Sequence, residues 1–104
     1  MDTQIDILVV KPDTGPYIER IENNNPAIQK LVGGYYEAVF PFNDSVVLLC
    51  NENGKLENLE RNRFVPELAD AIRGTFLVVG VQGSEFASLS PRLAKKYSKR
   101  FSLI

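Results

Sequence analysis

The stretch Val46-Val47-Leu48-Leu49-Cys50 is a continuous apolar run that decides the fold of this chain. A short apolar run bounded by turn residues predicts a buried strand. Asn43-Asp44 precedes the run, and Asn53-Gly54, a pair typical of a tight hairpin turn, follows it. We therefore expect residues 46–50 to form the central strand of a sheet, with a short return strand over residues 55–57.

Further runs that favour strands lie on both sides of this stretch. They are rich in β-branched and aromatic residues and are bounded by proline, glycine or asparagine. These runs cover residues 5–10, 17–22, 35–40 and 74–81. The first two are separated by a turn with two prolines, which predicts an antiparallel hairpin. Residues 58–72 give no clear pattern.

Two helices are predicted from their start and stop signals. Asparagine or serine before proline begins each one, within Asn23-Asn24-Asn25-Pro26 and at Ser90-Pro91. Gly33-Gly34 ends the first helix. We expect a single α+β domain over residues 1–104, with a small mixed or mostly antiparallel sheet of about five strands. The helices, at about 26–32 and 91–101, are expected to pack on one face of that sheet.

The composition lowers the expectation of catalysis. The chain of 104 residues has no histidine and one cysteine. It therefore lacks the usual general base, every Ser-His-Asp arrangement and imidazole ligands for a metal. We expect a protein that is not an enzyme and uses no metal or cofactor. A metal-dependent hydrolase that uses carboxylates, such as Glu57 with Glu60 or Glu67 with Asp70, stays an alternative.

The compartment is predicted from the same features. One cysteine allows no intrachain disulfide. The N-terminal residues are acidic where a signal peptide needs basic ones, and no apolar run approaches the roughly 20 residues that span a bilayer. We expect a cytoplasmic protein with no membrane contact.

Charge is distributed unevenly along the chain. All 13 acidic residues lie before residue 86, and five of the 12 basic residues lie in the predicted last helix. These five are Arg92, Lys95, Lys96, Lys99 and Arg100. The helix is a candidate basic surface for nucleic acid or an acidic protein, since lysine and arginine give salt-dependent affinity for phosphates. The alternative is an amphipathic helix whose charges are merely solvated.

A second candidate site combines polar residues at two predicted strand ends. Its members are Asn51, Glu52, Arg61, Asn62 and Arg63. Arginine offers a planar fork that matches a carboxylate or phosphate, so this patch could bind a nucleotide or another small anion. The alternative is a turn with a surface ion pair. Cys50 is expected to be a buried, inert thiol.

Aromatic residues in the 35–40 run suggest a contact surface. Side chains alternate between the two faces of a strand. We expect Tyr35 to point inward and Tyr36 outward, which would leave one ring available to a partner or a second copy. Ordinary packing on the sheet is the alternative.

Three motifs in order carry a resemblance to a known family. They are Leu31-Val32-Gly33-Gly34-Tyr35 with Glu37 and Val39, then Asn51-Glu52-x-Gly54-Lys55-Leu56 with Asn62-Arg63, then Gly74-Thr75-Phe76 with Val78, Val79 and Gly80. From about Ile5 to Phe101 the chain resembles domain of unknown function 3846. The resemblance implies no activity, cofactor or catalytic residue. It implies an origin in bacteria, phages or plasmids, and hence a role on mobile DNA.

The sequence predicts a small binding module that acts through its surface. On the resemblance, its sharpest form is a mobile-element-encoded inhibitor that contacts a protein of a host defence or DNA-processing complex. A small anionic ligand or nucleotide at Arg61 and Arg63 is one alternative, and nucleic-acid contact through the basic helix is another. A protein partner is expected, and a homodimer is left open.

Overall fold

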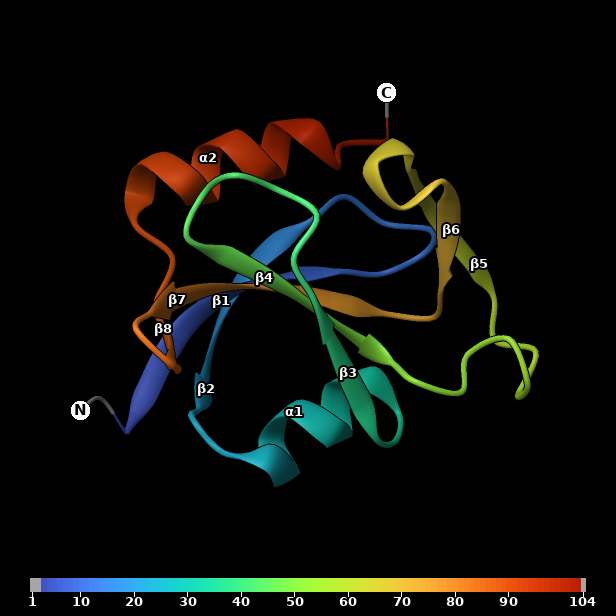
Figure 1. The fold of residues 1–104 in the computed structure, drawn as a ribbon, viewed down its shortest axis with the longest axis horizontal. Helices are drawn as coiled ribbons and strands as arrows, with labels where there is room; N and C mark the ends of the chain where they lie inside the picture. The colour runs from blue at the N-terminus through green and yellow to red at the C-terminus, as the bar shows by residue number, and fades with distance from the viewer. Residues whose placement is uncertain (1–2, 104) are drawn as a thin grey trace.

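The computed structural model describes residues 3–103 and consists of a main sheet, a two-stranded ribbon and two α-helices (Figure 1). The elements are β1 (Gln4–Val10), β2 (Tyr17–Glu22), α1 (Asn25–Val32), β3 (Tyr36–Val39), β4 (Val46–Asn51), β5 (Arg61–Val65), the 3-10 helix η1 (Pro66–Leu68), β6 (Asp70–Arg73), β7 (Phe76–Gln82), β8 (Glu85–Ala87) and α2 (Pro91–Arg100). None of the helices within residues 3–103 is long and apolar enough to cross a membrane.

The main sheet is antiparallel and has the strand order β2-β1-β7-β4-β3, with β8 also paired to β7. The expected α+β fold with an antiparallel sheet and two helices is confirmed. The middle strand is β7, because its residue Val78 pairs with Leu8 on one side and Leu48 on the other. The predicted central strand, β4, lies one position closer to the edge. β5 and β6 form a separate ribbon.

The two helices cover opposite faces of the sheet, and the expectation that both pack on one face is wrong (Figure 1). One core contains Leu93, Tyr97 and Phe101 of the C-terminal segment with Leu8, Val10, Leu48, Phe76 and Val78. The other contains Ile28 and Val32 of α1 with Ile7, Val9, Leu49, Leu77 and Val79. Continuous apolar strands such as β4, which is buried at all its positions, require cover on both faces.

Both helices begin where their capping residues predict. The Asn24 side chain accepts a hydrogen bond from the Ala27 amide at 2.9 Å, and Ser90 Oγ accepts one from the Leu93 amide at 3.2 Å. These contacts satisfy amides that the first helical turn leaves free. Gly33 ends α1 in the left-handed conformation, with φ of 82°.

The predicted return strand after Asn53-Gly54 is wrong. Residues 52–58 form consecutive turns, closed by bonds from the Glu57 amide to Asn53 O (2.8 Å) and from the Leu59 amide to Gly54 O (2.9 Å). The turns fold against β6, where a Cβ on Gly54 would lie 3.1 Å from Arg73 O. Residues 55–57 therefore lie in turns beside the ribbon and do not form the expected return strand.

Candidate functional site

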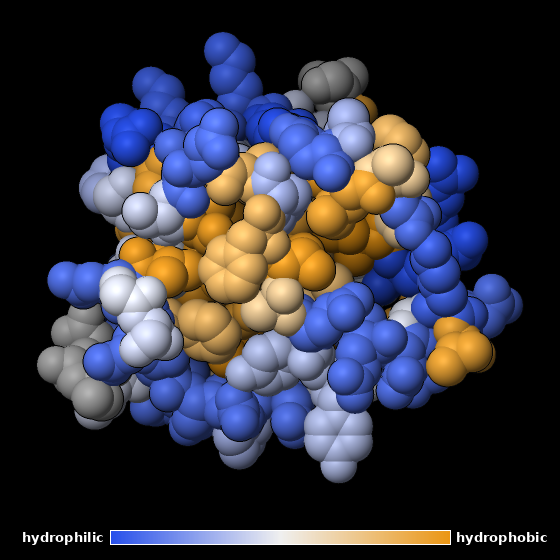
Figure 2. All heavy atoms as spheres, viewed as in Figure 1, coloured by the Kyte–Doolittle hydropathy of each residue, from blue (hydrophilic) through white to orange (hydrophobic). Residues whose placement is uncertain are grey.

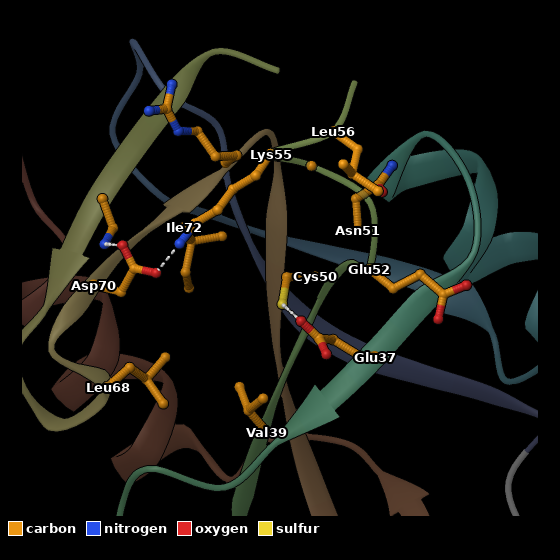
Figure 3. A pocket seen from close by; sticks show the side chains of 13 residues that line it. Glu37, Val39, Cys50, Asn51, Glu52, Lys55, Leu56, Leu68, Asp70 and Ile72 are labelled. Atoms are coloured by element: carbon orange, nitrogen blue, oxygen red, sulfur yellow. Dashed lines mark hydrogen bonds and ion pairs between the residues drawn. The ribbon is translucent and has the colours of Figure 1, made fainter. Parts of the chain in front are cut away.

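A pocket of about 340 Å³ lies between the β3–β4 end of the main sheet, the turns after β4, and the ribbon strand β6 (Figure 3). The residues that line it are Glu37, Val39, Cys50, Asn51, Glu52, Gly54, Lys55, Leu56, Leu68, Asp70, Ala71, Ile72 and Arg73. Apolar and charged side chains both contribute, which is typical of a binding site that takes an amphipathic group.

Charged groups stand on two sides of this pocket (Figure 3). Lys55 forms an ion pair with Asp70, and this bond lowers the pKa of the Asp70 carboxyl. Across from them, Glu37 has no basic partner among the described residues, and its neighbour is the Cys50 thiol, whose Sγ lies 4.0 Å from Glu37 Oε1. Burial, helped by the Glu37 charge, raises the pKa of Cys50 to about 11, so the thiol is neutral at physiological pH.

Asn51 has a structural role at the rim of the pocket. Its side-chain amide donates to Val32 O at 3.2 Å, and its Oδ1 accepts from the Asn53 amide at 2.8 Å. The side chain is buried and lies so close to Gly34 that a Cβ there would be 3.2 Å from Asn51 Nδ2. Asn51 therefore joins the end of α1 to β4. Glu52 is exposed and has no ion pair with the described residues.

Arg63 is held by backbone carbonyls from distant parts of the chain. Its Nε donates to Phe101 O at 3.0 Å, its Nη1 to Lys11 O at 2.7 Å and Pro12 O at 3.2 Å, and its Nη2 to Thr14 O at 2.8 Å. The guanidinium thus ties the β1–β2 turn and the C-terminal end of α2 to the ribbon. These donors are already used within the fold.

The five predicted ligand residues do not form one patch. Asn51 and Glu52 line the pocket, whereas Arg61, Asn62 and Arg63 do not. The buried Asn62 side chain donates to Val10 O and Gly74 O, both at 2.9 Å, and the Arg61 side chain is exposed without a hydrogen bond or ion pair to the described residues. β5 pairs with β6 with a register shift between Arg61 and Phe64, and the side chains of Asn62 and Arg63 bond to the backbone of other segments.

The predicted basic surface is partly neutralised by the fold. Lys96 Nζ lies 2.6 Å from Asp44 Oδ2, and Arg100 forms an ion pair with Glu67. These contacts lower the pKa of both Asp44 and Glu67. The Tyr97 hydroxyl also donates a hydrogen bond to Asp44 at 2.7 Å, which lowers the pKa of Asp44 further.

The other three basic residues of α2 form an exposed stripe. Arg92, Lys95 and Lys99 are spaced by three and four residues, which places them along one side of the helix. Their side chains make no hydrogen bond or ion pair with the described residues. The unpaired basic surface is therefore smaller than the sequence predicts.

The expected orientation of Tyr35 and Tyr36 is reversed. Tyr36 is half-buried, lies 6.5 Å from Phe86 between ring centroids, and donates a hydrogen bond to Asn25 Oδ1. Tyr35 is 69% exposed, and Phe40, just beyond the other end of β3, is 65% exposed. Packing of α1 on this face of the sheet buries Tyr36, so β3 is flanked by two exposed aromatic rings.

The outer edge of β3 has backbone groups without a partner strand. The Glu52 amide donates to Tyr35 O at 3.0 Å, which fixes Tyr35 and Glu52 as a hydrogen-bonded pair. In an antiparallel ladder, hydrogen-bonded pairs alternate with pairs that are not hydrogen-bonded. The backbone groups of Glu37 and Val39 therefore bond to β4. The N–H and C=O groups of Tyr36 and Ala38 point outward, away from β4. The strand order places no strand of the described chain beyond β3.

Residues 3–103 contain no group of three or more cysteine, aspartate or glutamate side chains placed to hold a metal ion. The hydrolase alternative depends on such a group, because carboxylate sites bind a catalytic metal through several oxygens. Ion pairing, backbone hydrogen bonding at β3 and apolar contact are the interactions that the pocket and its edge offer.

A family model described as "Domain of unknown function (DUF3846)" matches residues 5–102, nearly the whole chain. No curated protein and no solved structure matches the chain.

Proposed function

The chain belongs to the DUF3846 family, whose description assigns no activity, and we propose from the surface itself that it is a binding module for a partner protein. The partner would add an extended segment along the open edge of β3, as a further strand of the main sheet. Main-chain hydrogen bonds supply the affinity in this mode of recognition, and side-chain contacts supply the selectivity.

The unpaired backbone of β3 is the observation that carries this proposal. Tyr36 and Ala38 present outward N–H and C=O groups at one edge of the main sheet. An open strand edge is a ready template for another extended chain. A segment bound there would meet Tyr35 and Phe40 at the two ends of the strand.

The surroundings of β3 support contact with a partner. Glu37 and Val39 line the pocket, so a segment along the edge would run beside a hollow that can take one of its side chains. Figure 2 shows hydrophobic residues gathered over the region of β3 and β4, with hydrophilic residues around them. A bordered apolar area of this kind is typical of an interaction surface.

The other edge of the sheet, β2, is protected by charge. β2 carries Glu19, Arg20 and Glu22, and Arg20 Nε lies 2.8 Å from Asp6 Oδ1 on the neighbouring strand. β3 carries one charged residue, Glu37. Charged side chains discourage strand addition, so β3 is the more accessible edge of the two.

Replacing Ala38 with proline is expected to weaken binding strongly while the fold is retained. Proline removes an outward N–H that the ladder with β4 does not use, and edge strands tolerate proline at such positions. The probe is a phage-displayed library of random peptides of about seven residues, selected on the immobilised wild-type protein. Synthetic copies of the enriched peptides should bind A38P at least about tenfold more weakly in fluorescence anisotropy.

The matched control is Ile18→Pro, which removes an outward amide from β2. The hydrogen bond from the Asn23 amide to Thr3 O makes Thr3 and Asn23 a hydrogen-bonded pair. Such pairs alternate along the register of β1 and β2, so the backbone N–H of Ile18 points away from β1. Thermal unfolding should show that both variants stay folded. Peptides that bind A38P as tightly as wild type, or a library that enriches no binder, would overturn the proposal.

A further inference from the structure

We propose that the pocket beside β3 accepts a basic side chain, lysine or arginine, from the partner segment. This inference rests on the proposed function and names the chemistry of the partner at the same site. The pocket supplies an apolar lining for the aliphatic part of such a side chain and a carboxylate for its charged end. Lysine and arginine are suited to this arrangement because their stems bury readily while their charged groups stay near water.

Negative charge predominates in the lining of the pocket. Its lining contains three acidic residues and two basic ones. Lys55 is paired with Asp70, and the charge of Arg73 also acts on Asp70 and helps to lower its pKa. Glu37 and Glu52 have no basic partner among the described residues. In Figure 3 the Glu52 side chain extends away from the hollow, so Glu37 is the carboxylate that a cation from outside can pair with there. An anion would instead meet a lining with an excess of negative charge.

The rest of the lining suits an aliphatic stem. Val39, Leu68 and Ile72 contribute apolar side chains, and Figure 3 shows them facing the hollow from β3, η1 and β6. Cys50 adds a thiol that stays neutral, since burial raises its pKa to about 11. Contacts of this type accept methylene groups of lysine or arginine without requiring a further hydrogen bond.

The register of the open edge brings a partner residue close to Glu37. Glu37 directs its backbone bonds toward β4, so a residue opposite it on an added strand forms a non-hydrogen-bonded pair. The Cβ atoms of such pairs are about 4.5–5.5 Å apart, and their side chains lie on the same face of the sheet. That face carries the pocket, so a lysine or arginine there can reach both the Glu37 carboxylate and Val39.

A second copy of this chain does not supply the missing cation. If two β3 strands paired antiparallel about Glu37, the two glutamates would stand opposite each other, which is unfavourable. Pairing about Ala38 would place each Glu37 opposite Val39 of the other copy. The charge of the pocket thus favours a basic segment of another protein.

The test compares selection of the same peptide library on wild type and on Glu37→Gln, with Glu85→Gln as the matched control. Glu85 is an exposed glutamate on β8 with no part in the pocket. Wild type and E85Q should enrich peptides with lysine or arginine, and E37Q should not. Replacing the basic residue of an enriched synthetic peptide with norleucine should weaken its binding to wild type about fivefold and leave its binding to E37Q unchanged.

The outcomes separate this inference from the proposed function. Peptides that lose affinity for A38P but show no preference for a basic residue would overturn the inference and leave the proposed function standing. Peptides indifferent to A38P would overturn both. A dimer seen in sedimentation experiments and lost in A38P, without peptide binding, would show that a second copy occupies the edge and would also overturn both.

Discussion

Arg63→Ala is expected to lower the free energy of unfolding by about 3 kcal/mol, whereas Arg61→Ala should change it by less than about 0.5 kcal/mol. The two arginines are two residues apart on β5, but their surroundings differ. Arg63 donates hydrogen bonds to carbonyls of the β1–β2 turn and to Phe101 O. Removing a charged donor leaves several acceptors unpaired, which costs more than losing an exposed side chain.

Urea unfolding followed by circular dichroism measures this difference. Arg63→Lys should recover less than half of the loss, because lysine lacks the planar fork that reaches carbonyls in several directions. Equal destabilisation by R63A and R61A would contradict the structural role assigned to Arg63.

Gly80→Ala is expected to destabilise the protein by about 3 kcal/mol, at the upper end of the usual cost of overpacking. A Cβ at this position of β7 would lie 2.5 Å from Ser88 O and 2.9 Å from Ala87 O. Both atoms belong to the backbone at the end of β8, since Ala87 is its last residue and Ser88 follows it. That segment cannot shift cheaply, because the Leu89 amide donates to Asp6 O at 3.0 Å and the Asp6 amide donates to Ser88 Oγ at 2.8 Å.

The matched control for Gly80 is Gly15→Ala. A Cβ on Gly15 would meet no atom within 4 Å, and its φ is not in the left-handed region. This change should leave stability unchanged or raise it by about 0.5 kcal/mol, since alanine reduces the freedom of the unfolded chain. Thermal and urea unfolding of the two variants provide the comparison. A fully stable G80A protein would show that the backbone of β7 at Gly80 lies farther from Ala87 and Ser88 than the structure describes.

Local patterns were enough to predict most elements of the fold. Caps at Asn24 and Ser90 predict the starts of both helices, and short β-prone runs predict β1, β2, β3, β4 and β7 of the main sheet. The short strand β8 lies in a polar segment and was not predicted. The faces that the helices cover could not be predicted in the same way. Strands such as β4 are apolar on both sides, so their pattern does not say which helix covers which face.

The candidate site was harder to predict because its contacts are non-local. Lys55, Asp70 and Ile72 line the pocket from segments whose structure the sequence left open or assigned wrongly. Arg63 looked free because its carbonyl partners lie as far away as Lys11 and Phe101. Every residue has a backbone C=O group, so a side chain that donates to backbone can have any residue type as its partner, and the sequence does not reveal which one.

The most direct test of strand addition at β3 is backbone amide hydrogen exchange, measured by NMR with and without an enriched peptide. Binding along the edge should slow exchange of the outward Tyr36 and Ala38 amides by about tenfold or more, because each gains a hydrogen-bond acceptor. The outward amides of Ile18 and Arg20 on β2 should keep their rates. Unchanged exchange at Tyr36 and Ala38 in the saturated complex would contradict the account.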